Sequence, residues 1–235
     1  VICGAVGGSA SRAVADALYH LGTVVWSQGD NKSAWDYHQE AVEITRRLGL
    51  RDLVAAQAIH GLGESAWFSA QYRLAVQYFT ESLELSRQLG DKGLEDENLH
   101  NLGAMHTGML GADYPLAVQE LEMALEITRE GMLNWHIMPS LFILSLAKAG
   151  LGDYQTALEY SRQAIDTSQQ LKSFRYATVA HDFAGLLLQD LNLHQAAEEM
   201  HASGLEIARS NGIGFWLPRL QANLAIDRLN QGQMD

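Results

Sequence analysis

The chain has 235 residues, of which 47% are hydrophobic and 19% charged, so it can build a folded core and is not disordered throughout. Its 28 acidic and 16 basic side chains give a formal net charge of −12, and such a surface repels phosphate groups. Nucleic acid and membrane lipid are therefore excluded as favoured partners. The single cysteine, Cys3, cannot form an intramolecular disulfide, and no apolar run approaches the roughly 18 residues that span a bilayer. We expect a cytoplasmic protein.

Residues 1–11 contain three glycines, Gly4, Gly7 and Gly8, and predict a flexible lead-in before the first helix. This segment lacks the Gly-Lys-Ser/Thr ending of a phosphate-binding loop, so we expect no nucleotide and no other cofactor. The chain starts with Val1 rather than methionine and ends in a predicted turn at Asp235, which favours a fragment of a longer protein.

From residue 12 onward one pattern recurs five times. An alanine after a turn lies at Ala34, Ala75, Ala117, Ala157 and Ala196, at steps of 41, 42, 40 and 39 residues. Seven residues later each copy has a small residue, which is Ala41, Ser82, Ala124, Ala164 and Ser203. A bulky residue followed by a small one begins thirteen residues before this alanine, as with Phe183-Ala184 in the fifth copy. In the third copy the pair is Leu102-Gly103, which lies two residues further from its alanine. The pattern predicts repeats at about 12–50, 51–91, 92–132, 133–172 and 173–212, with a partial sixth at 213–235.

Each repeat predicts two helices joined by a short turn. In the first repeat Val14, Leu18 and Leu21 recur at spacings of three and four residues, which places them on one helical face. Gly29 suits the left-handed position that ends a helix, and Asp30 or Asn31 can cap the next one. Alternating β-branched runs are absent from the sequence, so we expect an all-α chain.

The spacing and residue types resemble the tetratricopeptide repeat (TPR). The matching residues are Leu21-Gly22, Ala34 and Ala41 in the first copy, Leu62-Gly63, Ala75 and Phe79 in the second, Leu102-Gly103, Ala117 and Ala124 in the third, and Tyr154, Ala157 and Ala164 in the fourth. The period is longer than the usual 34 or so residues, and the usual early Trp and closing Pro are missing. The longer unit is similar to repeats of Pins/LGN scaffolds and of the arms of bacterial STAND-type and LuxR-type regulators. The resemblance implies a right-handed α-solenoid, a superhelix of about five helix pairs plus one extra helix, that forms a single domain over 12–235.

In such a superhelix the first helices of the repeats line a concave groove. The expected groove residues are aromatic, imidazole and polar side chains at recurring positions of these helices: Tyr19, Thr23, Trp26, His60, Glu64, Trp67, His100, Asn101, Phe142 and His181. Tyrosine and tryptophan bring large rigid surfaces with a polar tip, which suits partner binding. For the two tryptophans, packing against the next repeat is an equal alternative.

The same residues permit a metal hypothesis. His60 and Glu64 lie one helical turn apart and His100 lies one repeat further on, and a catalytic zinc centre needs three such ligands. Polar groove residues bonded to their neighbours are the better interpretation, so we expect no metal site, no catalytic residue and no enzyme. Asn101 is present, but lysine and arginine are missing from the inward positions of the first three copies, which argues against a clamp for a C-terminal carboxylate.

We therefore expect a protein- or peptide-binding scaffold module from a larger signalling or transcription-regulatory protein. Its ligand would be an amphipathic helix or an extended segment with apolar anchors and some basic residues. A small-molecule-sensing regulatory arm is the alternative, and a metal-dependent enzyme comes third. Self-association through exposed solenoid ends is a further expectation, with candidate contacts at Leu217, Leu220, Leu224 and Ile226.

Overall fold

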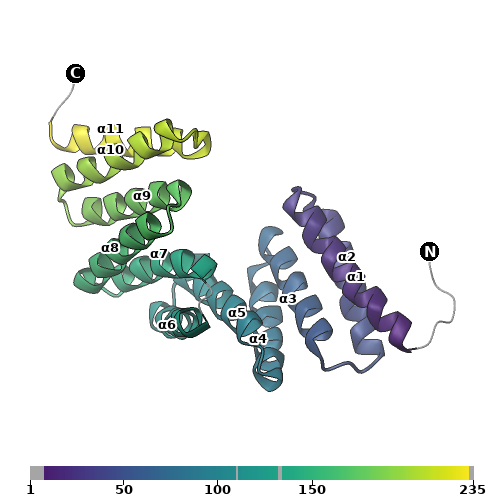
Figure 1. Cartoon of the computed structure of the whole chain (residues 1–235). Coiled ribbons are helices and arrows are strands. Elements are labelled where there is room, and N and C mark those ends of the chain that lie inside the picture. Colours follow the sequence, from purple (N-terminus) through teal and green to yellow (C-terminus); the bar gives the residue numbers. More distant parts are fainter. Residues whose placement is uncertain (1–7, 110, 132–133, 233–235) are drawn as a thin grey trace. The chain divides into compact units, whose positions relative to one another are not determined.

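The computed structural model describes residues 8–109, 111–131 and 134–232, and within these residues every regular element is helical (Figure 1). The described helices follow one another in chain order, two to each of five repeats: α1 (Gly8–Ser27) and α2 (Asn31–Arg47), α3 (Leu53–Phe68) and α4 (Tyr72–Leu89), α5 (Lys92–Ala104) and α6 (Tyr114–Gly131), α7 (Asn134–Gly150) and α8 (Tyr154–Gln170), and α9 (Phe174–Asp190) and α10 (His194–Ser210). A short 3₁₀ turn, Gly214–Trp216, leads into α11 (Leu217–Asn230). The predicted all-α class and the helix pairs are confirmed. None of the described helices is long and apolar enough to cross a bilayer.

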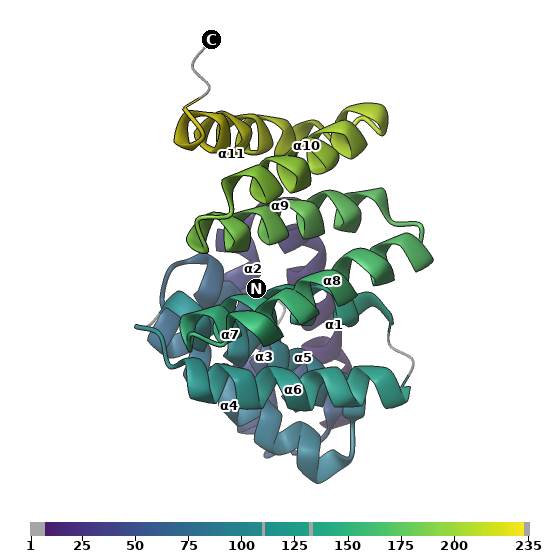
Figure 2. The same cartoon turned by 90° about the vertical axis from the view of Figure 1, so that its left-hand side faces the viewer.

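The chain divides into two compact units. The first comprises Val1–Asp113 and Glu126–Met132, and the second comprises Tyr114–Leu125 and Leu133–Asp235. In the first unit α1 packs against both α2 and α3, and α4 packs against α3 and α5. In the second unit α7 to α11 stack in chain order, as Figure 2 shows. That residues 12–235 form one continuous superhelix stays a prediction.

The turns inside the helix pairs have the predicted chemistry. Gly29 has φ of 88°, a left-handed conformation that costs a glycine nothing, and Asp30 then accepts a hydrogen bond from the Ser33 backbone N–H at 3.0 Å. Asp153 repeats this cap in the fourth pair. Asp52 and Asp91 cap the helices that begin new pairs, α3 and α5. The aspartates thus satisfy helix-terminal N–H groups that have no partner within the helix.

The start of α1 differs from the prediction. The helix begins at Gly8, so residues 8–11, which we expected in a flexible lead-in, belong to it. Serine and alanine are compatible with a first helical turn, and a glycine costs little at a helix end. Residues 1–7 lie outside the described part of the chain.

Small residues let the two helices of a pair approach closely. A Cβ added at Gly22 would lie 2.4 Å from the ring of His38, and one at Gly63 would lie 2.8 Å from the ring of Phe79. Real side chains do not approach that closely, so a ring on the second helix occupies the space that a glycine on the first leaves open. Gly185 and the ring of His201 form the same pair in the second unit, where the Cβ would come within 2.3 Å.

In the fifth repeat the predicted register is wrong by one residue. Asn192, with φ of 58°, takes the left-handed position that Gly29 holds in the first repeat, and α10 begins two residues later at His194. The buried alanine is therefore Ala197 rather than Ala196, and the second small residue is Gly204 rather than Ser203. The paired small residue on α9 is accordingly Gly185, so the bulky–small pair is shifted from Phe183-Ala184 to Ala184-Gly185.

The two extra residues of the third repeat lie at the end of its first helix. There α5 continues into a π-helical turn, Met105–Met109, which takes more residues per turn than an α-helix. The backbone N–H of Asp113 donates to the carbonyl of His106 at 2.8 Å and closes this segment before α6 begins. The longer turn explains why Leu102-Gly103 is displaced in the sequence pattern.

Candidate functional site

His60 on α3 is held between three helices of the first unit. Its Nδ1 donates to Asn98 Oδ1 on α5 at 3.0 Å, and Asn98 is fixed in turn by its own hydrogen bonds to Ser82 and to the Leu94 carbonyl. The other ring nitrogen, Nε2, therefore points to two carboxylates. It lies 3.8 Å from Glu64 Oε1, one turn along α3, and 3.6 Å from Glu97 Oε2 on α5. One imidazole is thus shared by two acidic side chains.

These neighbours change the charge of the imidazole. Burial by itself lowers the pKa of His60, but Glu64, Glu97 and the bond to Asn98 outweigh burial and raise this pKa from 6.5 to about 9. The pKa of Glu64 moves in the opposite direction: burial raises it, and the charges of His60 and His38 bring it below its usual value. At neutral pH the arrangement is therefore an imidazolium between two carboxylates.

Tyr19 on α1 completes this group. Burial, followed by the charges of Glu64 and Glu97, raises the pKa of the Tyr19 hydroxyl to about 12, so it remains a neutral phenol. Its ring lies 5.9 Å from the ring of His38, whose Nδ1 hydrogen-bonds Ser65 Oγ at 2.9 Å and whose pKa is lowered by burial. We call Tyr19, His60, Glu64 and Glu97 the acid–imidazole cluster.

Aromatic side chains gather at the C-terminal ends of α1 and α3. The ring of Phe68 lies 5.2 Å from Trp26 and 5.8 Å from Trp67, and Phe68 is 50% exposed. Trp67 also contacts the buried ring of Phe79 edge-on at 6.3 Å, so one side of the indole rests on the core. Both tryptophans are half-buried. We call Trp26, Trp67 and Phe68 the aromatic group.

The remaining predicted site residues are distributed over both units. Thr23 is half-buried and donates its hydroxyl to the carbonyl of Tyr19 at 3.1 Å, and His100 and Asn101 are half-buried on α5. Phe142 is only 7% exposed, stacks on Phe183 and belongs to the apolar core of the second unit. His181 donates Nδ1 to the carbonyl of Ala177, and the corrected register of the fifth repeat places Asp182, rather than His181, at the position that His60 holds in the second repeat.

Two of the predicted groove residues, His60 and Phe142, expose less surface to a partner than the sequence led us to expect. His60 is 3% exposed, because Asn98 and the ring of Phe79, at 5.5 Å, cover it, so it offers a partner little of its own surface. Phe142 is covered likewise by the packing of α7 on its neighbours. No three histidine, cysteine or acidic side chains of the described residues are grouped so that they could hold a metal ion, so the metal hypothesis for His60, Glu64 and His100 gains no support.

Sequence reasoning missed Glu97, Phe68 and His38. Glu97 lies three residues before His100 and therefore on the same face of α5, which is a signal that the pattern contained. Phe68 directly follows the predicted Trp67. His38 lies four residues after Ala34, where the second repeat has Phe79, so this position could have been recognised as a ring facing the small residue of the first helix.

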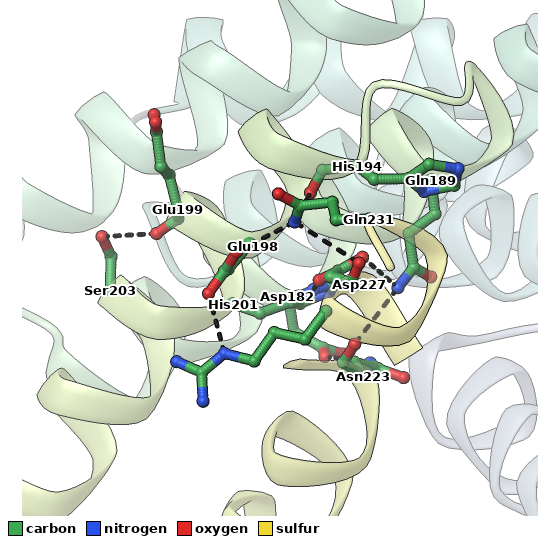
Figure 3. A network of polar contacts seen from close by, with 11 residues as sticks. Asp182, Gln189, His194, Glu198, Glu199, His201, Ser203, Asn223, Asp227 and Gln231 are labelled. Carbon is green, nitrogen blue, oxygen red and sulfur yellow. Dashed lines mark hydrogen bonds and ion pairs between the residues drawn. The ribbon is translucent and has the colours of Figure 1, made fainter. Parts of the chain in front are cut away.

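The second unit contains a related but different polar network, drawn in Figure 3. His201 on α10 donates Nδ1 to Asp227 on α11 at 2.6 Å, and Gln189 on α9 donates to the other oxygen of the same carboxylate at 2.6 Å. On α9, Asp182 accepts from Asn223 at 2.8 Å and pairs with Arg219 at 2.6 Å. Arg219 also lies over the rings of Phe183 and Trp216. Both of these buried carboxylates have partners from neighbouring helices, so the network ties α9, α10 and α11 together.

A crevice of about 370 Å³ lies between α2, α3 and α4 of the first unit. Its lining includes Arg46 and Glu81, which are joined by an ion pair of 2.9 Å, and the apolar Leu50, Ile59 and Leu85. None of the predicted site residues lines this crevice. The candidate site is therefore the face that carries the acid–imidazole cluster and the aromatic group on α1, α3 and α5.

Comparison with known proteins agrees with this architecture. Residues 13–88 match the family model of the tetratricopeptide repeat. Among solved structures, the apo form of RapI is 17% identical, with 94% of this chain and 85% of that chain covered at a TM-score of 0.69. A Rap protein complexed with Competence and Sporulation Factor is also 17% identical, with 95% and 66% covered at a TM-score of 0.65. A search of curated protein sequences gave no match.

A third structure is a Signal Transduction ATPase with Numerous Domains (STAND) protein with a tetratricopeptide repeat sensor from Pyrococcus horikoshii. It is 19% identical, with 95% of this chain covered at a TM-score of 0.75, and this chain spans 34% of that protein's length. Identities this low show a common fold. Residues 13–88 thus match the tetratricopeptide repeat model, and the described chain has the paired-helix fold of the tetratricopeptide-type solenoids.

Proposed function

We propose that this chain is a peptide- or protein-binding repeat module whose binding surface is the face of α1, α3 and α5 in the first unit. The observation that carries the proposal is the aromatic group. Phe68 is half exposed although both indoles of the group lie within 6 Å of its ring. Partly exposed aromatic side chains that are anchored on a core are typical energetic centres of binding surfaces, because they bury large area without losing many rotamers.

The charge of this face limits the ligand. The whole chain has a net charge of −12, and two of its carboxylates, the half-buried Glu64 on α3 and Glu97 on α5, lie on the helices of the proposed surface. Long-range repulsion disfavours nucleic acid and acidic segments, whereas a segment with an apolar anchor and basic residues is complementary to both features. Thr23, His100 and Asn101 complete the proposed contact surface, whereas Phe142 and His181 lie in the second unit and are not part of it.

The similar structures support a role in signalling. One of them is a Rap protein complexed with Competence and Sporulation Factor, and another carries its tetratricopeptide repeats as the sensor of a STAND protein. By analogy, the chain would be the non-enzymatic, ligand-sensing or partner-binding part of a larger regulatory assembly in the cytoplasm.

Selection from a display library of random 12-residue peptides tests the proposal. Enriched peptides are resynthesised with a fluorophore, and their affinity for the purified chain is measured by fluorescence anisotropy. Phe68→Ala should weaken binding at least tenfold, since truncation of a central aromatic residue costs about 2 kcal/mol or more. The matched control is Phe215→Ala, which removes an 87% exposed ring from the second unit and should leave affinity within twofold. Failure of any peptide to enrich, or equal losses in the two variants, would contradict the proposed surface.

A further inference from the structure

One side of α1 carries an exposed apolar stripe. Its members recur at spacings of three and four residues, so they share one helical face: Val14, Ala17, Leu21 and Val24. Val14 is 47% exposed, Leu21 42% and Val24 51%, although α1 packs against α2 and α3. Single exposed aliphatic residues are ordinary on a protein surface, whereas a continuous apolar face is typical of a contact surface. We call these four residues the α1 stripe.

The same positions are buried in other repeats. The positions that correspond to Val14, Leu21 and Val24 are Ala55, Leu62 and Ser65 in α3, and Ala177, Ala184 and Leu187 in α9. All six of these side chains are at most 7% exposed. The second helix of the preceding repeat covers them, since α2 packs against α3 and α8 packs against α9. The α1 stripe is therefore shaped to receive a helix of the α2 or α8 type.

The ring of α2 does not suit the α1 stripe. The ring of His38 lies 2.8 Å from where a Cβ at Gly61 would be, and its Nδ1 hydrogen-bonds Ser65 at 2.9 Å. On α1 the corresponding residues are His20 and Val24, so an imidazole fills the space of the glycine and the polar partner is missing. A helix on the α1 stripe therefore needs a small residue where α2 has a ring.

The packing of α8 on α9 meets this requirement. At the two positions just discussed α9 has Phe183 and Leu187, which are a ring and an aliphatic residue as on α1. At the position of the α2 ring, α8 has the small Ser161, which is 4% exposed. Ala164 follows three residues later and Ile165 four residues later, and both belong to the apolar core that contains Phe183. The fitting helix is therefore of the α8 type.

A carboxylate at the edge of this face adds a charge requirement. Arg46 on α2, eight residues after the ring, forms an ion pair of 2.9 Å with Glu81 on α4. Glu40 has on α2 the position that Glu81 has on α4, and its exposed side chain has no ion pair or hydrogen bond among the described residues. An arginine eight residues after the small residue of an incoming helix would reach Glu40. The net charge of −12 likewise favours a basic partner.

We propose that the α1 stripe is a docking face for an amphipathic helix of a partner protein. That helix has a small residue opposite His20, an alanine three positions later, isoleucine or valine four positions later, and an arginine eight positions later that pairs with Glu40. The inference does not rest on the proposed function, because Trp26 of the aromatic group lies on a different side of α1.

A second copy of the chain is a poorer occupant. The described second helices α2, α4, α8 and α10 bury their apolar faces within their own chain, so a copy has none of them to offer. Two copies would also bring together two net charges of −12.

The probe is a 20-residue peptide with the sequence of residues 153–172. Gln169→Arg places an arginine eight positions after Ser161, and Gln163→Lys allows a lactam bridge to Glu159 that keeps the peptide helical. The peptide is titrated into the full chain, whose leucine and valine methyl groups are ¹³C-labelled, and NMR follows the methyl signals.

The methyl signals of Val14, Leu21 and Val24 should shift with saturation below millimolar peptide. Leu193, which is 50% exposed in the turn before α10, is the internal reference and should not respond. Leu21→Lys and Val24→Asp should each weaken binding at least tenfold, because each buries a charge under the docked helix. Both side chains are exposed in the free chain, so the circular dichroism of the variants should be unchanged.

The pairing of the arginine with Glu40 is tested by a cycle of two changes. Glu40→Gln should weaken the Gln169→Arg peptide at least twofold and leave the affinity of the peptide that retains Gln169 unchanged. Glu199→Gln, at an exposed residue of α10, is the control and should change neither affinity.

Three outcomes would overturn the docking face. The first is the absence of shifts in the α1 stripe at millimolar peptide, or equal affinity of the wild type and Leu21→Lys. The second is loss of binding in Phe68→Ala but not in Leu21→Lys, which would place the peptide on the aromatic group and leave the proposed function standing. The third is a dimer in sedimentation equilibrium that Leu21→Lys abolishes while the peptide does not bind, which would make a second copy the occupant.

Discussion

His201 Nδ1 lies 2.6 Å from Asp227 Oδ2, and both side chains are completely buried between α10 and α11. His38 and Ser65 occupy the corresponding positions in the first unit, with Nδ1 2.9 Å from Oγ. The same contact therefore occurs in both units: a ring on the second helix of one repeat forms a hydrogen bond with a polar residue on the first helix of the next repeat. The residue that bonds the ring differs between the two units. In the second unit the acceptor is the carboxylate of Asp227, which also accepts a hydrogen bond from Gln189. We therefore expect Asp227 to contribute more to stability than Ser65.

Removal of the carboxylate at this position should destabilise the second unit. Asp227→Ala leaves the buried Nδ1 donor of His201 without an acceptor and removes one of the two acceptors of Gln189, which costs about 1–3 kcal/mol. Urea unfolding followed by circular dichroism measures the loss. Asp227→Ser should recover part of it because it restores an acceptor of the Ser65 type. A loss below about 1 kcal/mol in Asp227→Ala would show that water replaces the carboxylate.

The contact between Gly185 and His201 leads to a second prediction. Gly185→Ala places a Cβ 2.3 Å from Nε2 of a ring that is fixed by Asp227, so the ring cannot move away without breaking its hydrogen bond. We expect a loss of about 1–3 kcal/mol from overpacking, although alanine favours a helix more than glycine does. Gly214→Ala is the control, because a Cβ added at Gly214 would meet no atom within 4 Å. Similar midpoints of thermal unfolding for the two variants would contradict the steric explanation.

The helix pairs could be predicted from the sequence because their signals are local. Gly29 followed by Asp30 marks a turn through the intrinsic preferences of two residues, and the small residues recur with the repeat. The predicted register of the fifth repeat was wrong because Asn192 replaces the glycine of the turn and because Ala196 and Ala197 are adjacent. A one-residue shift between neighbouring alanines leaves the composition almost unchanged, and only burial of Ala197 identifies the true position.

The candidate site was less predictable because its contacts cross repeats. The sequence predicted that His60 and Glu64 share a helical face, and the structure brings them together as expected. The pattern placed Glu97 on the same face as His100, but it contained no sign that Asn98 covers one edge of the imidazole or that Glu97 reaches across to His60, since these residues are nearly 40 positions away from His60. The depth of a side chain below the surface depends on how neighbouring helices pack, and this depth changed the interpretation of His60 and Phe142.

A third prediction concerns the left-handed residue before α4. Ala70 has φ of 57°, a conformation in which its Cβ is strained, whereas the other turns use Gly29, Gly152 or Asn192 at this position. Ala70→Gly should stabilise the first unit by about 0.5–1 kcal/mol, because relief of strain exceeds the added entropy of the unfolded chain. Gly29→Ala should destabilise it by a similar amount. Chemical denaturation of both variants measures the pair, and a destabilising Ala70→Gly would contradict the prediction.

The pH dependence of stability provides a further test of the acid–imidazole cluster. The folded-state pKa of His60 is about 9, above its unfolded value of about 6.5, so its contribution to stability is fully present below pH 6.5. This contribution is lost as the pH rises through 9, and the loss amounts to roughly 3 kcal/mol at most. The pKa of Glu64 is depressed, so the stability that it contributes is present above its unfolded pKa and is lost on acidification. Urea unfolding between pH 6 and 10 should show the alkaline loss in the wild type, and the loss should be much smaller in His60→Gln. An identical alkaline loss in both proteins would assign it to other groups and would mean that the imidazole is not charged between Glu64 and Glu97.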